Sequence, residues 1–336
     1  MRIAIGVITR GRPRGLARLF ESLGELEREA RASQGAPSEN HPSVPHASVP
    51  HSAVVLDLEV ILVRNEPPRD DAPPPCRLPM RVLHEPRTGI PFARNKVLDA
   101  CLAEESPGGF DALAFVDDDE TVEPDWLARL AATLLAHDAD AATGPAPPHL
   151  PEDAPAWAKA SGGFDCLSFP TGTLRPTAFT HNVLVRVDAV RRHDLRFDER
   201  MAFTGGSDTH FFRRLARGGG RIVWCEEAIC REWAPASRLT RAWVLQRFYR
   251  VGATDAWIAL DLGEASRPGL TWLAVRYLIR GPVRWISRLA RGASSGSLLA
   301  MRCDVAHARG LLATVLGLDR HEEYRVHHGD DPGVAS

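Results

Sequence analysis

The sequence is poor in cysteine, and lysine occurs only at positions 96 and 159. The six cysteines form no CxxC pair and no cysteine–histidine spacing of the kind that binds zinc, which argues against a structural zinc site. In a chain of 336 residues they are expected to be reduced thiols rather than a disulfide scaffold. This cysteine usage predicts a cytoplasmic enzyme.

Long apolar runs and a large net charge are also missing. The apolar run at residues 3–8 is too short for the core of a signal peptide, and no run approaches the roughly 20 residues of a membrane span. A net charge of −2 gives no sign of a nucleic-acid-binding protein. The hydrophobic fraction of 44% suffices for a sizeable core, in one large domain with appendages or in two smaller domains.

Strand-like and helix-like segments alternate through the first 150 residues. Apolar runs rich in β-branched residues alternate with segments whose apolar residues recur at helical spacing. This order predicts an α/β fold with a mostly parallel sheet covered by helices in three layers. The predicted strands are 3–8, 58–64, 80–85, 112–116, 140–144, 182–187 and 221–225, and the predicted helices are 13–27, 90–104, 124–137 and 208–219.

Three parts are expected along the chain. An α/β domain would occupy residues 1–236, a helical region residues 237–320 and a disordered tail residues 321–336. Within the first part, residues 30–52 are rich in Ser, Pro and His without periodicity, which predicts a flexible surface insertion.

Three consecutive aspartates, Asp117, Asp118 and Asp119, follow the predicted strand 112–116. An acidic triplet alone is most often a solvated turn. In an α/β sheet, however, ligands bind at the carboxyl ends of the strands, and this strand ends in the triplet. Carboxylate oxygens suit Mg²⁺ or Mn²⁺, and such an ion completes its shell with substrate phosphates. The position therefore predicts a divalent-cation site that serves a nucleotide diphosphate.

The ordered segments from residue 3 to about residue 255 resemble glycosyltransferase family 2, in particular bacterial exopolysaccharide enzymes of the succinoglycan type. The segments that carry this resemblance are "TRGRPRGLARLFESL", "VILVRN", "TGIPFARNKVLDACL", "FVDDDE", "HNVLVR", "FDERMAFTGGSDTHFFRRL", "GGRIVWC" and "SRLTRAWVLQRFYRVG". The resemblance implies a GT-A fold and transfer of a sugar, with inversion, from a nucleotide-diphosphate sugar such as a UDP-sugar. The implied acceptor is a saccharide, commonly lipid-linked, and the implied cofactor is Mn²⁺ or Mg²⁺.

The resemblance also implies roles for single residues. Asp117 and Asp119 form the DxD pattern of the metal site, in which Asp119 would bind the metal on the diphosphate and Asp117 the ribose or the metal. Asp208 in "GGSDTHFF" would be the catalytic base, and either Ser207 or Asp208 could also cap the helix that follows. The residues expected around the donor are Thr9, Arg10, Arg12, Asn65, Arg94, Asn95, Asp117 and Asp118. The residues expected near the diphosphate or the acceptor are Asn182, Trp233, Arg238, Arg247 and Arg250.

Two positions depart from the family pattern. Ser207 replaces the usual acidic neighbour of the base, and Trp233 stands where related sequences tend to have a histidine near the metal. Trp233 is either a core residue or a platform for an acceptor sugar ring. For Arg247 and Arg250, phosphate binding and a solvated helix face are equally weighted readings.

Beyond residue 262 the resemblance weakens, and a basic helical segment follows. Its arginines, at 276, 280, 284, 288 and 291, are spaced so that they fall along one side of a helix, with tryptophan, leucine and isoleucine elsewhere. This segment is either a packed helix with a solvated basic face or a peripheral contact with anionic lipid, which we favour. The protein would then lie on the inner face of the plasma membrane.

Two other functions remain open on sequence alone. A nucleotidyltransferase of similar architecture also uses carboxylates and a metal, but it usually has a Gly-rich loop ending in lysine, and "TRGRPRG" has no lysine. A non-catalytic relative that binds a nucleotide sugar or a glycan is the third interpretation, encouraged by Ser207 and Trp233. Release of nucleoside diphosphate from a sugar nucleotide separates these alternatives.

Overall fold

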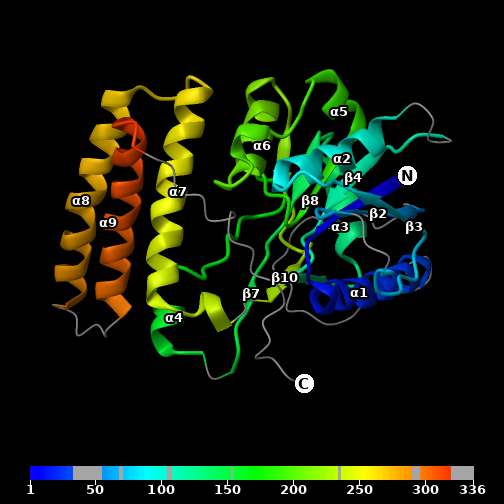
Figure 1. Ribbon diagram of the computed structural model, residues 1–336, viewed down its shortest axis with the longest axis horizontal. Coiled ribbons are helices and arrows are strands. Elements are labelled where there is room, and N and C mark those ends of the chain that lie inside the picture. Colours follow the sequence, from blue (N-terminus) through cyan, green and yellow to red (C-terminus); the bar gives the residue numbers. More distant parts are fainter. Residues whose placement is uncertain are drawn as a thin grey trace. The chain divides into compact units, whose positions relative to one another are not determined.

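The computed structural model describes residues 1–32, 55–67, 71–103, 108–152, 154–233, 236–289 and 296–318. The chain forms two compact units that interleave in sequence (Figure 1). The first unit comprises Met1–Pro147, Leu167–Glu199 and Phe211–Glu232, and the second comprises Pro148–Cys166, Arg200–His210 and Trp233–Ser336. Residues 33–52 of the predicted insertion and the predicted tail 321–336 lie outside the described residues.

A seven-stranded sheet forms the centre of the first unit, in the order β3-β2-β1-β4-β8-β6-β9. Neighbouring strands are parallel except at β8, which runs antiparallel to both β4 and β6. The sheet is therefore mixed but mostly parallel, as predicted. Its strands are β1 (Arg2–Thr9), β2 (Asp57–Arg64), β3 (Met80–His84), β4 (Ala112–Phe115), β6 (Ala141–Thr143), β8 (Val183–Arg186) and β9 (Ile222–Trp224).

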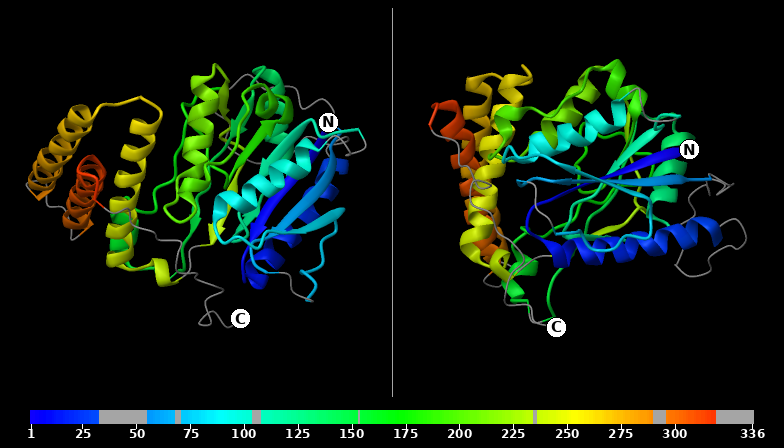
Figure 2. Two further views of the ribbon diagram at one scale, coloured as in Figure 1. Left: turned by 45° about the horizontal axis from the view of Figure 1, so that its top comes forward. Right: turned by 45° about the vertical axis from the view of Figure 1, so that its right-hand side comes forward.

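Helices cover both faces of this sheet, because its central strands are apolar on both sides. One core cluster packs α1 and α3 against one face, and a second packs α2, α5 and residues 211–217 against the other. Figure 2 shows α1 (blue) and α2 (cyan) on opposite sides of the sheet. The helices are α1 (Pro13–Ala32), α2 (Ile90–Leu102), α3 (Trp126–Ala136), α5 (Val187–Arg192) and α6 (Ser207–Arg217).

Several predicted boundaries differ from the structure. Helix α1 runs to Ala32, so the first three residues of the predicted insertion are helical. Val187, predicted at the end of a strand, begins α5. The short strand β5 (Glu120–Val122), directly after the aspartates, was not predicted. It pairs antiparallel with β10 (Cys230–Trp233), and Val122 opposes Cys230.

The second unit is mainly helical, as predicted for the region after residue 238. Helix α9 packs against both α7 and α8, and two glycines allow the close approach to α7. A Cβ atom on Gly252 would lie 2.2 Å from the carbonyl oxygen of His307, and one on Gly310 would lie 2.0 Å from that of Tyr249. The elements are β7 (Pro148–His149), α4 (Ala156–Ala160), the 3-10 turns Glu199–Met201 and Ala236–Arg238, α7 (Arg241–Asp261), α8 (Arg267–Leu289) and α9 (Gly296–Val315).

No helix in the described ranges combines the length and the apolar character that a bilayer crossing requires.

Candidate active site

The carboxyl ends of three adjacent parallel strands of the first unit meet at one edge of the sheet. Strand β1 lies between β2 and β4, and all three run in the same direction. They end at Thr9, Arg64 and Phe115. Of the residues predicted to bind the donor, the loops that follow contain Arg10, Arg12, Asn65, Asp117 and Asp118, whereas Arg94 and Asn95 lie in α2. This is the edge at which α/β sheets bind their ligands. The prediction that the aspartates directly follow a buried strand of the sheet, at its carboxyl end, is confirmed.

Asp118 is the innermost of the three aspartates. Its side chain is buried, and it accepts a hydrogen bond of 2.6 Å from the Thr9 hydroxyl and one of 3.1 Å from Nη1 of Arg12. The same Arg12 nitrogen donates a hydrogen bond of 2.9 Å to Oδ2 of Asp119. Thus Asp118 is held by the last residue of β1 and by Arg12 in the loop that follows, and Arg12 bridges two neighbouring carboxylates.

Burial controls the charge of this cluster. Burial raises the pKa of Asp118 to about 7, although the nearby Arg12 guanidinium acts in the opposite direction. For Arg12, burial alone would lower the pKa, but the carboxylates of Asp118 and Asp119 outweigh burial and raise it. Arg12 therefore stays cationic and neutralises part of the acidic cluster.

Asp117 and Asp119 face a more open environment than Asp118. Their side chains are 39% and 16% exposed, compared with 7% for Asp118. Nη2 of Arg94 lies 4.0 Å from Oδ1 of Asp117, and its guanidinium lies over the ring of Phe197. Two accessible carboxylates offer the hard oxygen ligands that Mg²⁺ and Mn²⁺ prefer, so the donor set fits such an ion.

Glu120 was missed in the sequence analysis, although its side chain holds the backbone of the aspartate segment. Its side chain is buried, and its Oε2 accepts a hydrogen bond of 2.9 Å from the backbone N–H of Asp117. The same oxygen lies 3.4 Å from Sγ of Cys230, which donates a weak hydrogen bond to it. Burial raises the pKa of Glu120 well above its usual value. Nothing in the sequence signals this burial, because Glu120 continues an acidic run and its partner Cys230 is about 110 residues away.

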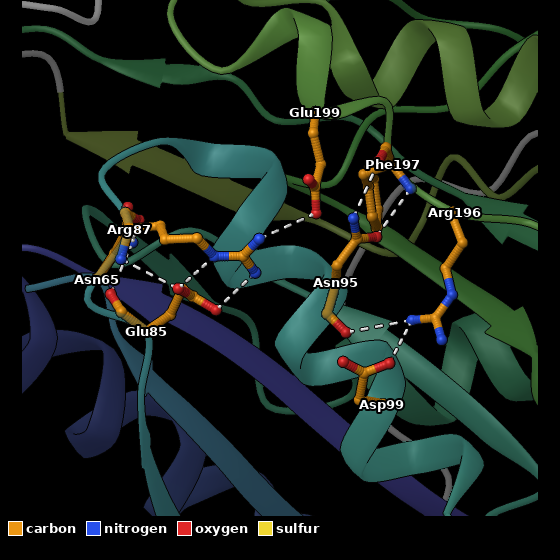
Figure 3. A network of polar contacts seen from close by, with 8 residues as sticks. All are labelled: Asn65, Glu85, Arg87, Asn95, Asp99, Arg196, Phe197 and Glu199. Carbon is orange, nitrogen blue, oxygen red and sulfur yellow. Dashed lines mark hydrogen bonds and ion pairs between the residues drawn. The ribbon is translucent and has the colours of Figure 1, made fainter.

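Asn65 fixes the loop that follows β3 (Figure 3). Its Nδ2 donates to the carbonyl oxygens of Glu85 and Arg87, at 3.1 and 2.7 Å, and its Oδ1 accepts from the N–H of Gly89 at 3.1 Å. The side chain of Glu85 in turn accepts two hydrogen bonds from the Arg87 guanidinium, which also lies 3.6 Å from Glu199. Asn65 therefore shapes the start of α2, and its predicted place around the donor stays a prediction.

Asn95 and Asn182 also bond to the backbone of distant segments. Asn95 exchanges two hydrogen bonds with the backbone of Phe197, at 3.0 and 2.9 Å (Figure 3). Asn182 is fully buried, accepts from Nε1 of Trp126 at 2.8 Å, and donates to the carbonyls of Pro145 and Ala228 at 2.9 and 2.7 Å. Both amides thus hold the loops in place. Their predicted roles toward the donor and the acceptor are not tested by these contacts.

Asp208, the predicted base, lies in the first turn of α6 and belongs to the second unit. Two glycines with positive φ, Gly205 at 76° and Gly206 at 81°, bring the chain into this turn. A Cβ atom on Gly206 would lie 2.2 Å from Cγ2 of Thr254, so only glycine fits there. Oδ1 of Asp208 accepts from the N–H of Thr209 at 2.7 Å. The turn is therefore tightly specified and holds a half-buried carboxylate.

The aromatic and basic residues predicted near the acceptor lie elsewhere in the second unit. The ring of Trp233 lies 4.1 Å from that of His149, measured between centroids. The guanidinium groups of Arg238 and Arg247 lie 5.8 and 5.3 Å from the ring centre of Trp243. The remaining predicted residues, Arg250 in α7 and Arg10 after β1, are both half-buried.

Comparison with known proteins identifies the family. A family model described as "Glycosyl transferase family 2" matches residues 51–193. The "Succinoglycan biosynthesis protein ExoM" of Rhizobium meliloti (strain 1021) is 33% identical over 247 residues, which cover 72% of this chain and 75% of ExoM. The chain belongs to glycosyltransferase family 2. The family-2 enzyme is thus a glycosyltransferase, and the predicted family, enzyme class and α/β fold are confirmed.

Among solved structures, the family-2 fold is similar to TarS of S. aureus. One TarS structure has a TM-score of 0.47 and 14% identity, over 76% of this chain and 43% of that chain. The structure of TarS 1–349 in complex with UDP-GlcNAc has a TM-score of 0.47 and 16% identity, over 78% of this chain and 67% of that chain. This chain therefore spans less than half of the longer TarS chain.

Proposed function

We propose that the chain transfers a sugar, with inversion, from a nucleotide-diphosphate sugar to a saccharide acceptor during exopolysaccharide biosynthesis. The acceptor class that we propose is a lipid-linked saccharide, and the donor class is a UDP-sugar. Identity to a protein named for succinoglycan biosynthesis supports the polysaccharide assignment. The observation that carries the proposal is the carboxylate cluster at the shared edge of β1 and β4.

The donor diphosphate is assigned to this cluster. Asp117 and Asp119 would hold Mg²⁺ or Mn²⁺, and the ion when bound would neutralise charge on the diphosphate. Arg12 and Arg94 supply positive charge beside the same carboxylates, which suits a group with several anionic oxygens. Buried Asp118 would position the loop rather than bind the ion, because Thr9 and Arg12 already occupy both of its oxygens.

Asp208 is assigned as the base. In an inverting transfer, the acceptor oxygen bonds to the anomeric carbon, the bond from that carbon to the diphosphate breaks, and the hydroxyl proton needs an acceptor. A carboxylate fixed by the two-glycine turn is suited to take this proton. The adjacent His149 and Trp233 rings, tilted by 45° to each other, supply an aromatic surface of the kind that sugar rings contact, and we assign them to acceptor binding.

A donor screen tests the proposal. The purified chain is incubated with individual sugar nucleotides, with and without Mn²⁺, and release of nucleoside diphosphate is measured against a panel of saccharide acceptors. Asp119→Ala should lose metal-dependent donor binding. Asp208→Ala should bind donor normally and turn over about 10²–10⁴-fold more slowly, the usual contribution of a general base.

A carboxylate distant from the cluster provides the control. Asp188 lies in the first turn of α5 with a 65% exposed side chain, and Asp188→Ala should behave like the wild type. Near-native turnover of Asp208→Ala would remove the base assignment but leave the donor site intact. Consumption of nucleoside triphosphate in place of sugar nucleotide would contradict the proposed function as a whole.

A further inference from the structure

Helix α8 has apolar residues on two opposite sides. On one side, the buried residues Leu270 and Ala274 belong to the core of the second unit, where α8 packs on α9. Buried Gly281 continues this side, because its added Cβ would lie 3.1 Å from Cβ of Asp304 in α9. On the other side, five large apolar side chains are exposed by 44–64%. These five residues, called here the α8 stripe, are Trp272, Val275, Ile279, Val283 and Ile286.

The spacing of the α8 stripe places it on one helix face. Its members follow one another at intervals of three, four, four and three residues, which keeps them within a narrow sector of an α-helix. Figure 1 shows α9 between α7 and α8, and among the described helices of the second unit α9 is the one that packs on α8. A continuous row of exposed large apolar side chains marks an interaction surface.

Positive charge borders the stripe. Arg276 and Arg280 each lie one position after a stripe residue and are exposed, and the guanidinium of Arg276 lies over the ring of Trp272. Within Arg267–Leu289 there are five arginines and no acidic residue. Arg284 lies 3.8 Å from Asp304 and so faces toward α9. The side chain of Arg288 and all of Arg291 lie outside the described residues.

We propose that the α8 stripe binds the surface of a membrane that contains anionic lipid. A helix with one exposed apolar face bordered by arginine lies in the plane of such a surface, with its apolar side chains among the acyl chains and its cations at the headgroups. Arg276 and Arg280 lie one helical turn apart beside a stripe that contains a tryptophan, and this spacing matches such an arrangement. The buried opposite face keeps α8 attached to α9.

Charge argues against a second copy of the chain as the occupant. If two stripes packed face to face in an antiparallel pair, their arginine rows would meet across the contact, and α8 contributes no carboxylate to offset the repulsion. An anionic lipid surface offers both the apolar medium and the opposite charge. This inference depends on α8 alone and not on the proposed donor or base.

Vesicle flotation of the full chain tests the inference. The chain is mixed with vesicles of phosphatidylcholine alone or of phosphatidylcholine with phosphatidylglycerol, and the floated fraction gives a partition coefficient. The wild type should float with the anionic vesicles and be released by salt. Its tryptophan fluorescence should be quenched by lipids brominated in the acyl chains, and Trp272→Ala should reduce this quenching.

Two variants separate the apolar and the charged contributions. The double variant Ile279→Ser/Val283→Ser should no longer float with anionic vesicles, because it removes two apolar side chains from the stripe. The fold should persist, because both side chains are about 60% exposed and contribute little to the core. Arg276→Gln/Arg280→Gln should lower the partition coefficient about 30-fold, since each basic residue near an anionic surface contributes about fivefold. The matched controls are Leu174→Ser, a residue 62% exposed in the first unit, and Arg217→Gln at the end of α6.

Three results would overturn the inference. The first is a wild type that does not float with anionic vesicles while circular dichroism shows it folded. The second is a stripe variant that floats as well as Leu174→Ser. The third is a concentration-dependent dimer, seen by sedimentation, that the stripe substitutions dissociate without any effect on vesicle binding. Donor turnover on a water-soluble acceptor should be the same in all these variants, which separates this test from that of the proposed function.

Discussion

Nη1 of Arg12 donates a hydrogen bond of 2.9 Å to Oδ2 of Asp119. A permanent cation therefore lies against one of the two carboxylates assigned to the metal. A divalent ion at Asp119 would be repelled by this guanidinium unless the side chain moves toward the donor phosphates. At about 5 Å in a water-like dielectric, this repulsion amounts to about 1–2 kcal/mol.

Removing this charge should strengthen binding of the metal alone. Arg12→Gln is expected to bind Mn²⁺ about tenfold more tightly than the wild type in the absence of sugar nucleotide. Titration of Mn²⁺ followed by electron paramagnetic resonance measures the affinity, and Arg14→Gln on the exposed start of α1 is the control. Unchanged or weaker Mn²⁺ binding in Arg12→Gln would show that Asp119 is not a metal ligand.

Because of Glu120, the free energy of unfolding of the metal-free protein should fall as pH rises. Its pKa in the folded state is raised above the usual 4.5 by burial, so the folded state holds a proton that the unfolded state releases. The stabilising contribution is therefore complete below about pH 4.5 and is lost as pH rises through the folded pKa. Urea unfolding in EDTA should show that the free energy of unfolding falls less between pH 5 and pH 8 for Glu120→Gln than for the wild type. Parallel curves for the two proteins would contradict this prediction.

Substitution of Asn182 tests whether this residue stabilises the fold or contacts the diphosphate or the acceptor. Asn182→Ala removes the partner of the Trp126 indole N–H and of the buried Ala228 carbonyl, at about 1–3 kcal/mol for each group. It also removes one of the two hydrogen bonds to the Pro145 carbonyl, which still accepts from the N–H of Cys230 at 3.2 Å. We expect a loss of about 3–5 kcal/mol in the free energy of unfolding, measured with urea. The KM for donor of the remaining folded enzyme should be unchanged. A raised KM without a loss of stability would instead support the predicted contact with diphosphate or acceptor.

Gly206 should be required for both stability and turnover. Gly206→Ala combines a positive φ of 81° with a Cβ contact of 2.2 Å to Thr254, so the turn that holds Asp208 must move. We expect a loss of more than about 2 kcal/mol in stability and a lower kcat. Gly219→Ala is the matched control, because its φ is 91° but no atom lies within 4 Å of the added Cβ. Equal effects of the two substitutions on kcat would argue against a fixed Asp208.

The sequence predicted the elements that depend on local pattern. The strands that became β1, β2 and β4 are continuous apolar runs, and their order placed the aspartates at the functional edge. The pairing of β5 with β10 could not be predicted, since it joins segments about 110 residues apart and each is very short. The same holds for Glu120, whose partner Cys230 comes from the second of these strands.

The asparagines have structural partners that the sequence did not indicate. The family resemblance implied that Asn65, Asn95 and Asn182 bind a ligand, and these roles stay predictions. In the structure each of them hydrogen-bonds backbone groups of another segment. Such partners are set by the three-dimensional path of the loops, which hydrophobic periodicity does not encode.

The central claim is that Asp117 and Asp119 bind a divalent cation together with the donor diphosphate. Anomalous diffraction of manganese, in crystals grown with Mn²⁺ and a sugar nucleotide, tests it most directly. The account predicts a manganese peak about 2.0–2.5 Å from a carboxylate oxygen of Asp119 or Asp117, with a diphosphate oxygen in the same coordination shell. A bound sugar nucleotide whose diphosphate lies away from these carboxylates, with no manganese beside them, would contradict it.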